Sequence, residues 1–152
     1  MANMEINEEI NTAHNAFKAL DTRELNPLQM AYVGDTVHDL YVRSMLLSRG
    51  MTVGKMHKQA VRMVSAGAQA RMLEAIECEL SEEEADITRR GRNSQAKHAA
   101  PKHADPADYA HATGLEALWG YLYLSGRTQR LDELIKLALE RTEDLWQKRT
   151  SK

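Results

Sequence analysis

The chain has 152 residues, of which 43% are hydrophobic and 28% are charged, a composition typical of a globular domain with its own hydrophobic core. Its single cysteine, Cys78, excludes an intramolecular disulfide, and its formal net charge of −2 excludes a uniformly basic surface. No apolar run approaches the roughly 20 residues that cross a bilayer, and the acidic start MANMEINEEI does not resemble a signal peptide. We expect one domain over residues 1–152, no membrane association and a cytoplasmic location.

Helix-start and helix-stop signals follow one another along the chain, and no segment shows the alternation of a strand. Asn26-Pro27 and Asp105-Pro106 each combine an N-cap with a proline at the first helical position. Ser81 with Glu84 forms a capping box. We predict an all-α fold of about seven helices, with residues 1–23 as a helical lead-in. The predicted helices cover about 5–20, 27–49, 53–64, 66–79, 81–90, 105–124 and 128–148.

One segment between these helices has no helical pattern, residues 91–104, GRNSQAKHAAPKHA. It belongs to a basic stretch, 87–104, that contains no acid, directly after the acidic SEEEAD at 81–86. Long loops without secondary structure are uncommon in compact domains and are usually functional or disordered. The sequence therefore predicts a long basic loop, and any phosphate-binding surface of this chain is expected to be local.

Two apolar helices carry glycine beside a carboxylate. AYVGDTVHDL contains Gly34 and Asp35, and ATGLEALWGYLYL contains Gly120 and Glu116. A helix glycine costs roughly 1 kcal/mol relative to alanine, but it allows a second helix to approach closely. Such an approach would bring Asp35 and Glu116 together, where two carboxylates repel unless a cation lies between them. Mg²⁺ is commonly held by one or two carboxylates, whereas the alternative on pattern alone is a buried salt bridge to an arginine.

The same segments resemble a known family. AYVGDTVHDLYVRSMLL resembles the signature helix of the ribonuclease III catalytic domain, and EALWGYLYLSG resembles its second signature helix. The resemblance is greatest to the Mini-ribonuclease III branch, which lacks a double-stranded-RNA-binding domain, and it covers about residues 24–142. It implies the ribonuclease III catalytic fold and a homodimer that cleaves double-stranded RNA with Mg²⁺, for which Mn²⁺ can substitute. The expected products have 5′-phosphate and 3′-hydroxyl ends, and the expected substrate is precursor large-subunit (23S) ribosomal RNA.

The resemblance also implies roles for individual residues. Asp35 and Glu116 match two of the family's four metal-site acids, while Ala31 and Thr113 stand where larger relatives have the other two. The Mini branch shares both replacements, and the number of metal ions stays open. Asp39 is either a further ligand or a solvated acid. The residues expected to contact RNA are Arg89, Arg90, Arg92, Asn93, Lys97 and Lys102.

Other matching positions, Arg43, His57 and Gln69, receive no role, and Ala110 replaces an arginine expected in many relatives. The main alternative to an enzyme is a non-catalytic double-stranded-RNA-binding protein of the same fold. A third hypothesis is a helical interaction module in which Asp35 and Glu116 pair with arginines inside the core.

Overall fold

The computed structural model of the chain describes residues 20–147, which are helical between short connections and contain no strand. The all-α class predicted from the sequence is confirmed, while the predicted helix at 5–20 lies outside the described residues except for its last position. The elements are η1 (Thr22–Glu24), α3 (Pro27–Ser48), α4 (Val53–Met63), α5 (Ala66–Ile76), η2 (Glu77–Glu79), α6 (Glu82–Ala96), α7 (Pro106–Leu124), α8 (Thr128–Arg141) and α9 (Glu143–Trp146).

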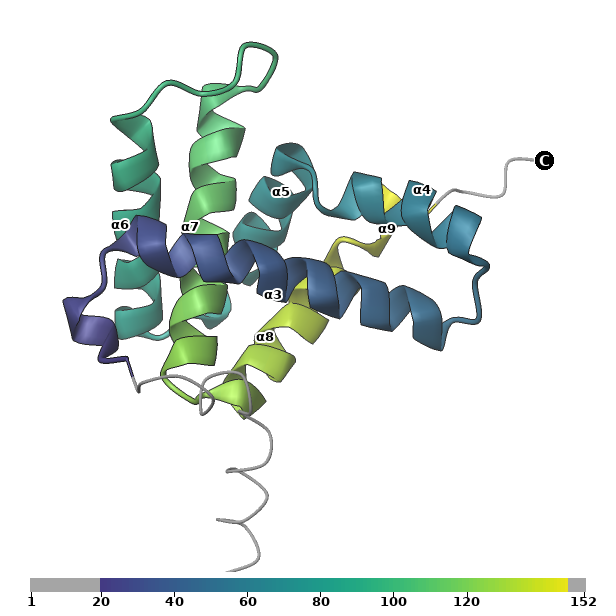
Figure 1. The fold of residues 1–152 in the computed structure, drawn as a ribbon, viewed down its shortest axis with the longest axis horizontal. Coiled ribbons are helices and arrows are strands. Elements are labelled where there is room, and N and C mark those ends of the chain that lie inside the picture. Colours follow the sequence, from purple (N-terminus) through teal and green to yellow (C-terminus); the bar gives the residue numbers. More distant parts are fainter. Residues whose placement is uncertain (1–19, 148–152) are drawn as a thin grey trace, which may run out of the picture.

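Helix α7 is the centre of the arrangement and packs against α3, α5, α6 and α8. Figure 1 shows α6 and α7 side by side, joined by a loop at one end, with α3 crossing them. Eleven of the residues of α7 are buried, so this helix is apolar on nearly all sides, as expected for a helix enclosed by others. All eleven lie between Ala112 and Leu124, so an acid within that part of α7, such as Glu116, lies close to the core.

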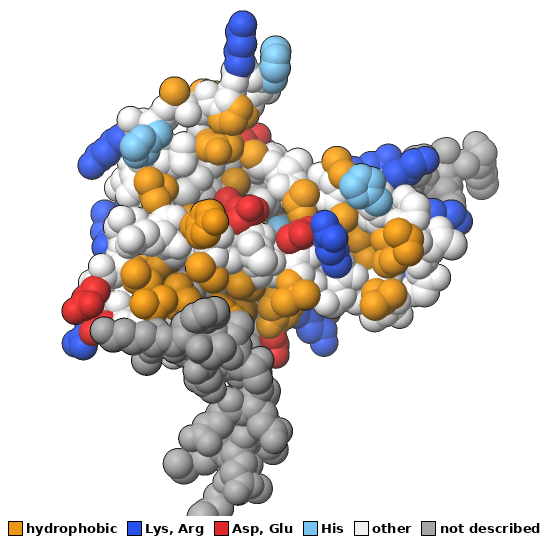
Figure 2. Space-filling model, viewed as in Figure 1, with side chains coloured by type: hydrophobic (Ala, Val, Ile, Leu, Met, Phe, Trp, Pro, Cys, Tyr) orange, Lys and Arg blue, Asp and Glu red, His pale blue; other side chains and the backbone are white. Residues whose placement is uncertain are grey.

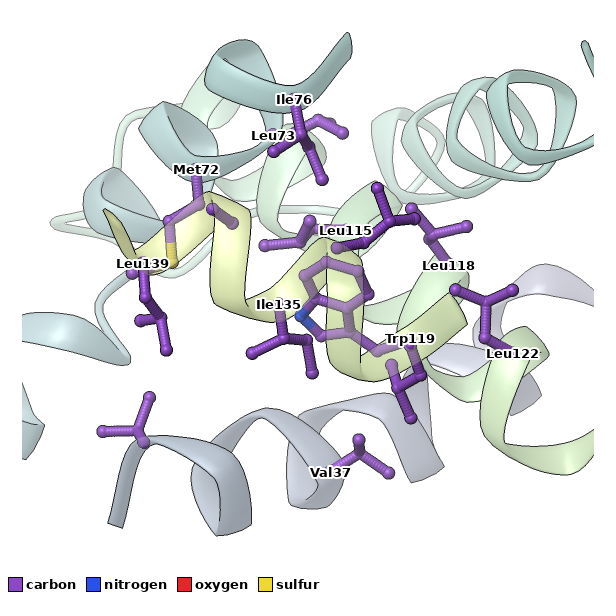
Figure 3. Packing of buried hydrophobic residues seen from close by; sticks show 14 of the residues in the cluster. Val37, Met72, Leu73, Ile76, Leu115, Leu118, Trp119, Leu122, Ile135 and Leu139 are labelled. Atoms are coloured by element: carbon purple, nitrogen blue, oxygen red, sulfur yellow. The ribbon is translucent and has the colours of Figure 1, made fainter. Parts of the chain in front are cut away.

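The hydrophobic core is one cluster built from α3 to α9. Its largest members include Trp119 and Trp146, each no more than 2% exposed. Figure 3 shows Trp119 among the packed side chains of the cluster, with Ile135 of α8 and Val37 of α3 nearby. Burial of side chains of this size contributes about 1.5–3 kcal/mol each, so the crossing of α3 and α7 is held by substantial apolar contact.

The predicted helix boundaries are confirmed where side-chain caps define them. The Asn26 side chain accepts from the Gln29 backbone N–H and the Ser81 side chain accepts from that of Glu84, each within a complete capping box. At the C-terminal ends, Gly50 and Gly126 adopt φ values of +71° and +75°, the left-handed conformation that glycine adopts without a Cβ penalty.

The predicted loop at 91–104 is wrong in its first half, because α6 continues to Ala96. Gly91 does not end the helix. Gly91 lies on the side of α6 that faces α7, and a Cβ at this position would lie 3.0 Å from the Gly114 Cα and from the Ala117 Cβ. The glycine therefore permits close packing of α6 on α7, and the connection between these helices shrinks to residues 97–105.

The predicted helix at 128–148 is also wrong at its end. Helix α8 stops at Arg141 and the short α9 follows after Thr142. The break reorients the chain so that Trp146 enters the core and its Nε1 donates to the Leu139 carbonyl at 3.3 Å. The neighbouring Leu145 is 54% exposed. Within residues 20–147, no helix combines the length and apolar character needed to cross a membrane.

Candidate active site

The candidate site lies where α3 crosses α7, and two glycines set the distance between these helices. A Cβ at Gly34 would overlap the backbone carbonyl of Glu116, and a Cβ at Gly120 would overlap that of Met30. Each helix thus contributes a glycine against the other's backbone. The expected close approach of the helix that bears Glu116 to Gly34 is confirmed, and it explains why both helices tolerate a residue that weakens them.

Asp35 and Glu116 line one cavity of about 350 Å³. Asp35, on α3, is exposed, whereas Glu116, on α7, is partly buried. The other polar residues of the lining come from four helices, α3, α5, α6 and α7, and are Tyr32, Gln69, Gln95, Tyr109 and Thr113. Figure 2 shows acidic side chains near the middle of this face, with hydrophobic side chains around them. The structure therefore brings the two predicted acids together.

The cavity holds the two carboxyl groups in an electrostatically unfavourable position. Burial, a hydrogen bond with the Asp35 side chain and the Asp35 charge, in that order, raise the pKa of Glu116 to about 9. Glu116 is thus protonated at neutral pH in the cation-free protein, as expected when two carboxylates share a site without a counter-charge. No ion pair among residues 20–147 includes Asp35 or Glu116, so the arginine-paired interaction module has no support here.

The lining of the cavity fits a hard divalent cation. Between residues 20 and 147, no group of three or more His, Cys, Asp or Glu side chains is arranged to hold a metal, so an ion here would have two carboxylates only. Mg²⁺ accepts such sites because it keeps several waters and prefers oxygen ligands. The buried Gln69 Oε1 has no hydrogen-bond partner among residues 20–147, and it adds an oxygen acceptor to the same lining.

Asp39 is not brought into the cavity. Its carboxylate pairs with Arg43, one turn further along α3, at 3.0 Å, and neither residue lines the cavity with Asp35. A ligand role for Asp39 stays a prediction that this geometry does not favour. Its partner Arg43, together with His57, lines a separate hollow beyond α3, next to the start of α4.

The six predicted RNA-contacting residues are spread over α6 and the loop that follows, and none of them lines the acidic cavity. Arg90, Asn93 and Lys97 are exposed at positions that share the outer face of α6. Arg89 is exposed on the same face but is paired with Asp86. Lys102 is exposed in the 97–105 loop. The helix therefore presents a basic stripe on its outer side and Gln95 to the cavity.

Arg92 differs from the other five because it is engaged within the fold. Its Nη1 lies 3.7 Å from Glu77 Oε1 and 3.4 Å from His111 Nε2. His111 Nδ1 is hydrogen-bonded to the Ala107 carbonyl at 2.7 Å, which leaves Nε2 as the acceptor for Arg92. These contacts favour a role for Arg92 in fastening α6 to its neighbours.

Sequence reasoning did not assign Gln69, Gln95 or Tyr109 to the site, although all three line the cavity. Gln69 was named as a matching position without a role, and its signal was a glutamine on the apolar face of a helix. Gln95 was hidden because its segment was predicted to be a loop. Tyr109 had no signal, since an aromatic residue on an apolar helix is usually part of the core.

A second polar contact joins the same two helices one turn beyond the acids. Trp119 Nε1 donates to His38 Nδ1 at 3.2 Å, and His38 Nε2 lies 3.0 Å from the Met63 carbonyl. Because Nδ1 accepts, Nε2 carries the proton and donates to that carbonyl. Burial lowers the pKa of His38, so the ring is neutral and both of its nitrogens are satisfied.

The chain is similar to proteins of one known family. Residues 28–127 match the family model described as "Ribonuclease III domain". A Mini-ribonuclease 3 from Symbiobacterium thermophilum is 49% identical over 117 residues, covering 76% of this chain and 89% of the relative. A Mini-ribonuclease 3 from Clostridium tetani is 38% identical over 130 residues, or 84% and 85% of the two chains. A crystal structure of a Fusobacterium nucleatum protein, 27% identical, superposes with a TM-score of 0.71 over 79% of this chain and 96% of that one.

Proposed function

Because this chain belongs to the ribonuclease III family, within its Mini-ribonuclease 3 branch, we propose that it is a divalent-metal-dependent endoribonuclease that cleaves double-stranded RNA. The observation that carries the proposal is the pairing of Asp35 with Glu116 in one cavity that no lysine or arginine of the described chain lines. Both acids lie within the matched domain. The expected ion is Mg²⁺, with Mn²⁺ as a substitute, because the lining offers oxygen ligands alone among its charged groups.

In this proposal, one set of residues binds the ion and another set binds the RNA. Asp35 and Glu116 would bind the cation, and when bound it supplies electrostatic stabilisation of the charge that develops on the cleaved phosphate. Without the ion, the Glu116 carboxyl retains a proton at neutral pH. Asp35 is exposed at the cavity, where an RNA phosphate can reach it. Binding of the cation by both carboxylates would therefore be accompanied by release of the Glu116 proton.

The duplex is proposed to lie along the outer face of α6 and the 97–105 loop. Arg90, Asn93, Lys97 and Lys102 are exposed there, and A-form RNA is recognised mainly through its phosphates and 2′-hydroxyls. Phosphate contacts by cationic side chains make binding strongly salt-dependent. Replacing Lys97 with alanine should weaken binding to all duplex sequences and reduce the salt slope by about 1, whereas Arg92→Ala should act mainly on stability.

A homodimer is proposed because α3 exposes apolar side chains beside the site. Tyr32 is 83% exposed, Leu40 is 62% exposed and Leu47 is 66% exposed, and Val53 at the start of α4 is 78% exposed. The three α3 residues recur at helical spacing on one side, and such contiguous apolar surface commonly marks a protein interface. In the dimer each subunit would cut one strand. The expected substrate is precursor 23S ribosomal RNA in the cytoplasm, as the family resemblance implies.

A cleavage assay with duplex RNA separates this proposal from its alternative. Purified protein is incubated with an end-labelled duplex with Mg²⁺, with Mn²⁺ or with EDTA, and the product ends are mapped. We expect double-strand cuts with 5′-phosphate ends in either metal and intact RNA in EDTA. Duplex RNA that is bound but stays intact in both metals would support the non-catalytic RNA-binding protein instead.

A further inference from the structure

Gln69 is a buried polar residue of the cavity, and the proposed function gives it no role. It lies on α5 among the buried residues of that helix, and it is only 3% exposed. It lines the same cavity as Asp35 and Glu116. A glutamine in such a place is unusual, since buried polar groups are almost always hydrogen-bonded.

The orientation of the Gln69 amide follows from its one hydrogen bond. Its Nε2 donates to the Val64 carbonyl at 3.0 Å. The flipped orientation would place two oxygens against each other, so the nitrogen must face Val64. The Oε1 is therefore held on the other side of the amide. It is buried and has no partner among the described residues, which leaves an acceptor prepared for a donor that the fold does not supply.

The neighbours of Gln69 in the cavity decide which donor suits it. Asp35 and Glu116 contribute acceptors once they are ionised, so the two carboxylates and the Gln69 amide all bring acceptor oxygens to one hollow. Within residues 20–147 no third acid joins the two carboxylates. A hydrated divalent cation satisfies such a lining, because the ion attracts the carboxylates and its waters donate hydrogen bonds outward.

We propose that Gln69 is a positioning residue whose Oε1 accepts a hydrogen bond from a water of the divalent cation held by Asp35 and Glu116. The inference rests on the proposed function, since it assumes that the cation binds in this cavity. The hydrogen bond to Val64 holds the amide, and the amide holds the water. Partners of this kind around a metal typically change its affinity 10- to 100-fold when they are removed.

Binding of Mn²⁺ alone, without RNA, tests the proposal. Free Mn²⁺ is measured by electron paramagnetic resonance while it is titrated into wild-type protein and variants whose folding has been checked by circular dichroism. Gln69→Met, which keeps the length but removes the oxygen, should bind Mn²⁺ about 10-fold more weakly. Gln69→Glu keeps an oxygen, and its carboxyl, protonated in this buried acidic setting, can still donate to the Val64 carbonyl, so Mn²⁺ affinity should stay within about threefold of wild type. Gln69→Asn, which withdraws the oxygen by one methylene, should fall between them.

A matched control removes a glutamine amide elsewhere. Gln59 also donates its Nε2 to a backbone carbonyl, that of Trp146, and Gln59→Met should leave Mn²⁺ binding unchanged. Equal Mn²⁺ affinity in Gln69→Met and wild type would overturn the proposal, and so would equal weakening in Gln69→Met and Gln69→Glu, which would indicate only a tether to Val64. If wild type and Asp35→Asn bind Mn²⁺ equally, the metal site of the proposed function fails, and this inference fails with it.

Discussion

Two polar contacts join α3 to α7 one turn apart, and they have opposite character. His38 and Trp119 meet as acceptor and donor, fully buried, with a further hydrogen bond from the ring to Met63. Asp35 and Glu116, each three residues earlier on the same helices, meet as two acids in a cavity. The first contact satisfies every polar group that it buries, and the second leaves a conflict that burial makes worse.

The difference between the two contacts separates the one that stabilises the fold from the one that is suited to a ligand. Both depend on the close approach that Gly34 and Gly120 allow, so packing alone does not explain why one pair is complementary and the other is not. A sequence that specifies one structure usually avoids such conflicts except at functional sites. This difference supports our proposal that the acid pair binds a cation, whereas the His38–Trp119 pair stabilises the crossing itself.

The largest effect is expected from breaking the acid pair itself. If Asp35 holds the proposed cation, Asp35→Asn should reduce Mg²⁺-dependent cleavage of duplex RNA by at least about 100-fold, because a metal ion in such a site contributes several kcal/mol to phosphodiester cleavage. Single-turnover cleavage rates measure this. Asp144→Asn, an exposed acid on α9, is the control and should cleave like wild type. Asp39→Asn sharpens the assignment, since a loss as large as that of Asp35→Asn would add Asp39 to the ligands.

Separating the two helices should damage both contacts together. Gly34→Ala places a methyl group on the Glu116 carbonyl and should lower the free energy of unfolding by about 3 kcal/mol through overpacking. Cleavage should fall in the same variant. Gly54→Ala on α4 is the matched control, because nothing lies within 4 Å of its Cβ position. It should leave stability unchanged or raise it by up to about 1 kcal/mol, as chemical denaturation can show. A Gly34→Ala protein as stable as wild type would contradict the close crossing.

Removing one acid should stabilise the cation-free protein even though it abolishes activity. The folded pKa of Glu116 is raised from 4.5 to about 9, so the unfolded chain releases its proton first and wild-type stability falls as pH rises through this range. Glu116→Gln removes that loss and should raise the free energy of unfolding at pH 8 by about 1–2 kcal/mol. Measured in EDTA, a variant less stable than wild type at pH 8 would show that the acids are not in conflict.

The smallest effect is expected from the satisfied contact. Burial lowers the folded pKa of His38, so its contribution to stability is complete above the unfolded value of about 6.5 and is lost as pH falls below it. This one group can change the free energy of unfolding by at most about 1.4 kcal/mol per pH unit. Comparing the pH dependence of unfolding in wild type and His38→Gln isolates it. Parallel curves for the two proteins between pH 7 and pH 5 would mean that His38 is not buried as a neutral ring.

Much of this fold could be predicted from the sequence because its helix ends are marked by local chemistry. Asn26, Ser81 and Asp105 cap their helices through side-chain hydrogen bonds, which depend only on neighbouring residues. The errors arose where tertiary contact overrides local preference. Gly91 read as a helix stop but packs α6 against α7, and the break at Thr142 is explained by burial of Trp146, which no local pattern indicates.

The candidate site was predictable in part for the same reason. Glycines near acids on apolar helices indicated a close crossing, and the structure brings Asp35 and Glu116 into one cavity. The role of Gln69 was not accessible, because an amide reveals its unsatisfied oxygen only when its surroundings are known. The separation of Arg92 from the basic stripe also depends on partners distant in the chain, Glu77 and His111.

The central claim is that the acid pair at the α3–α7 crossing holds the cation that drives RNA cleavage. A crystal of the protein soaked in Mn²⁺ and measured for anomalous scattering tests this claim most directly, because the ion's position is observed without reference to activity. We predict an anomalous peak between the carboxylates of Asp35 and Glu116 that disappears in Asp35→Asn crystals. A peak located elsewhere, or one that persists unchanged in the variant, would contradict the account.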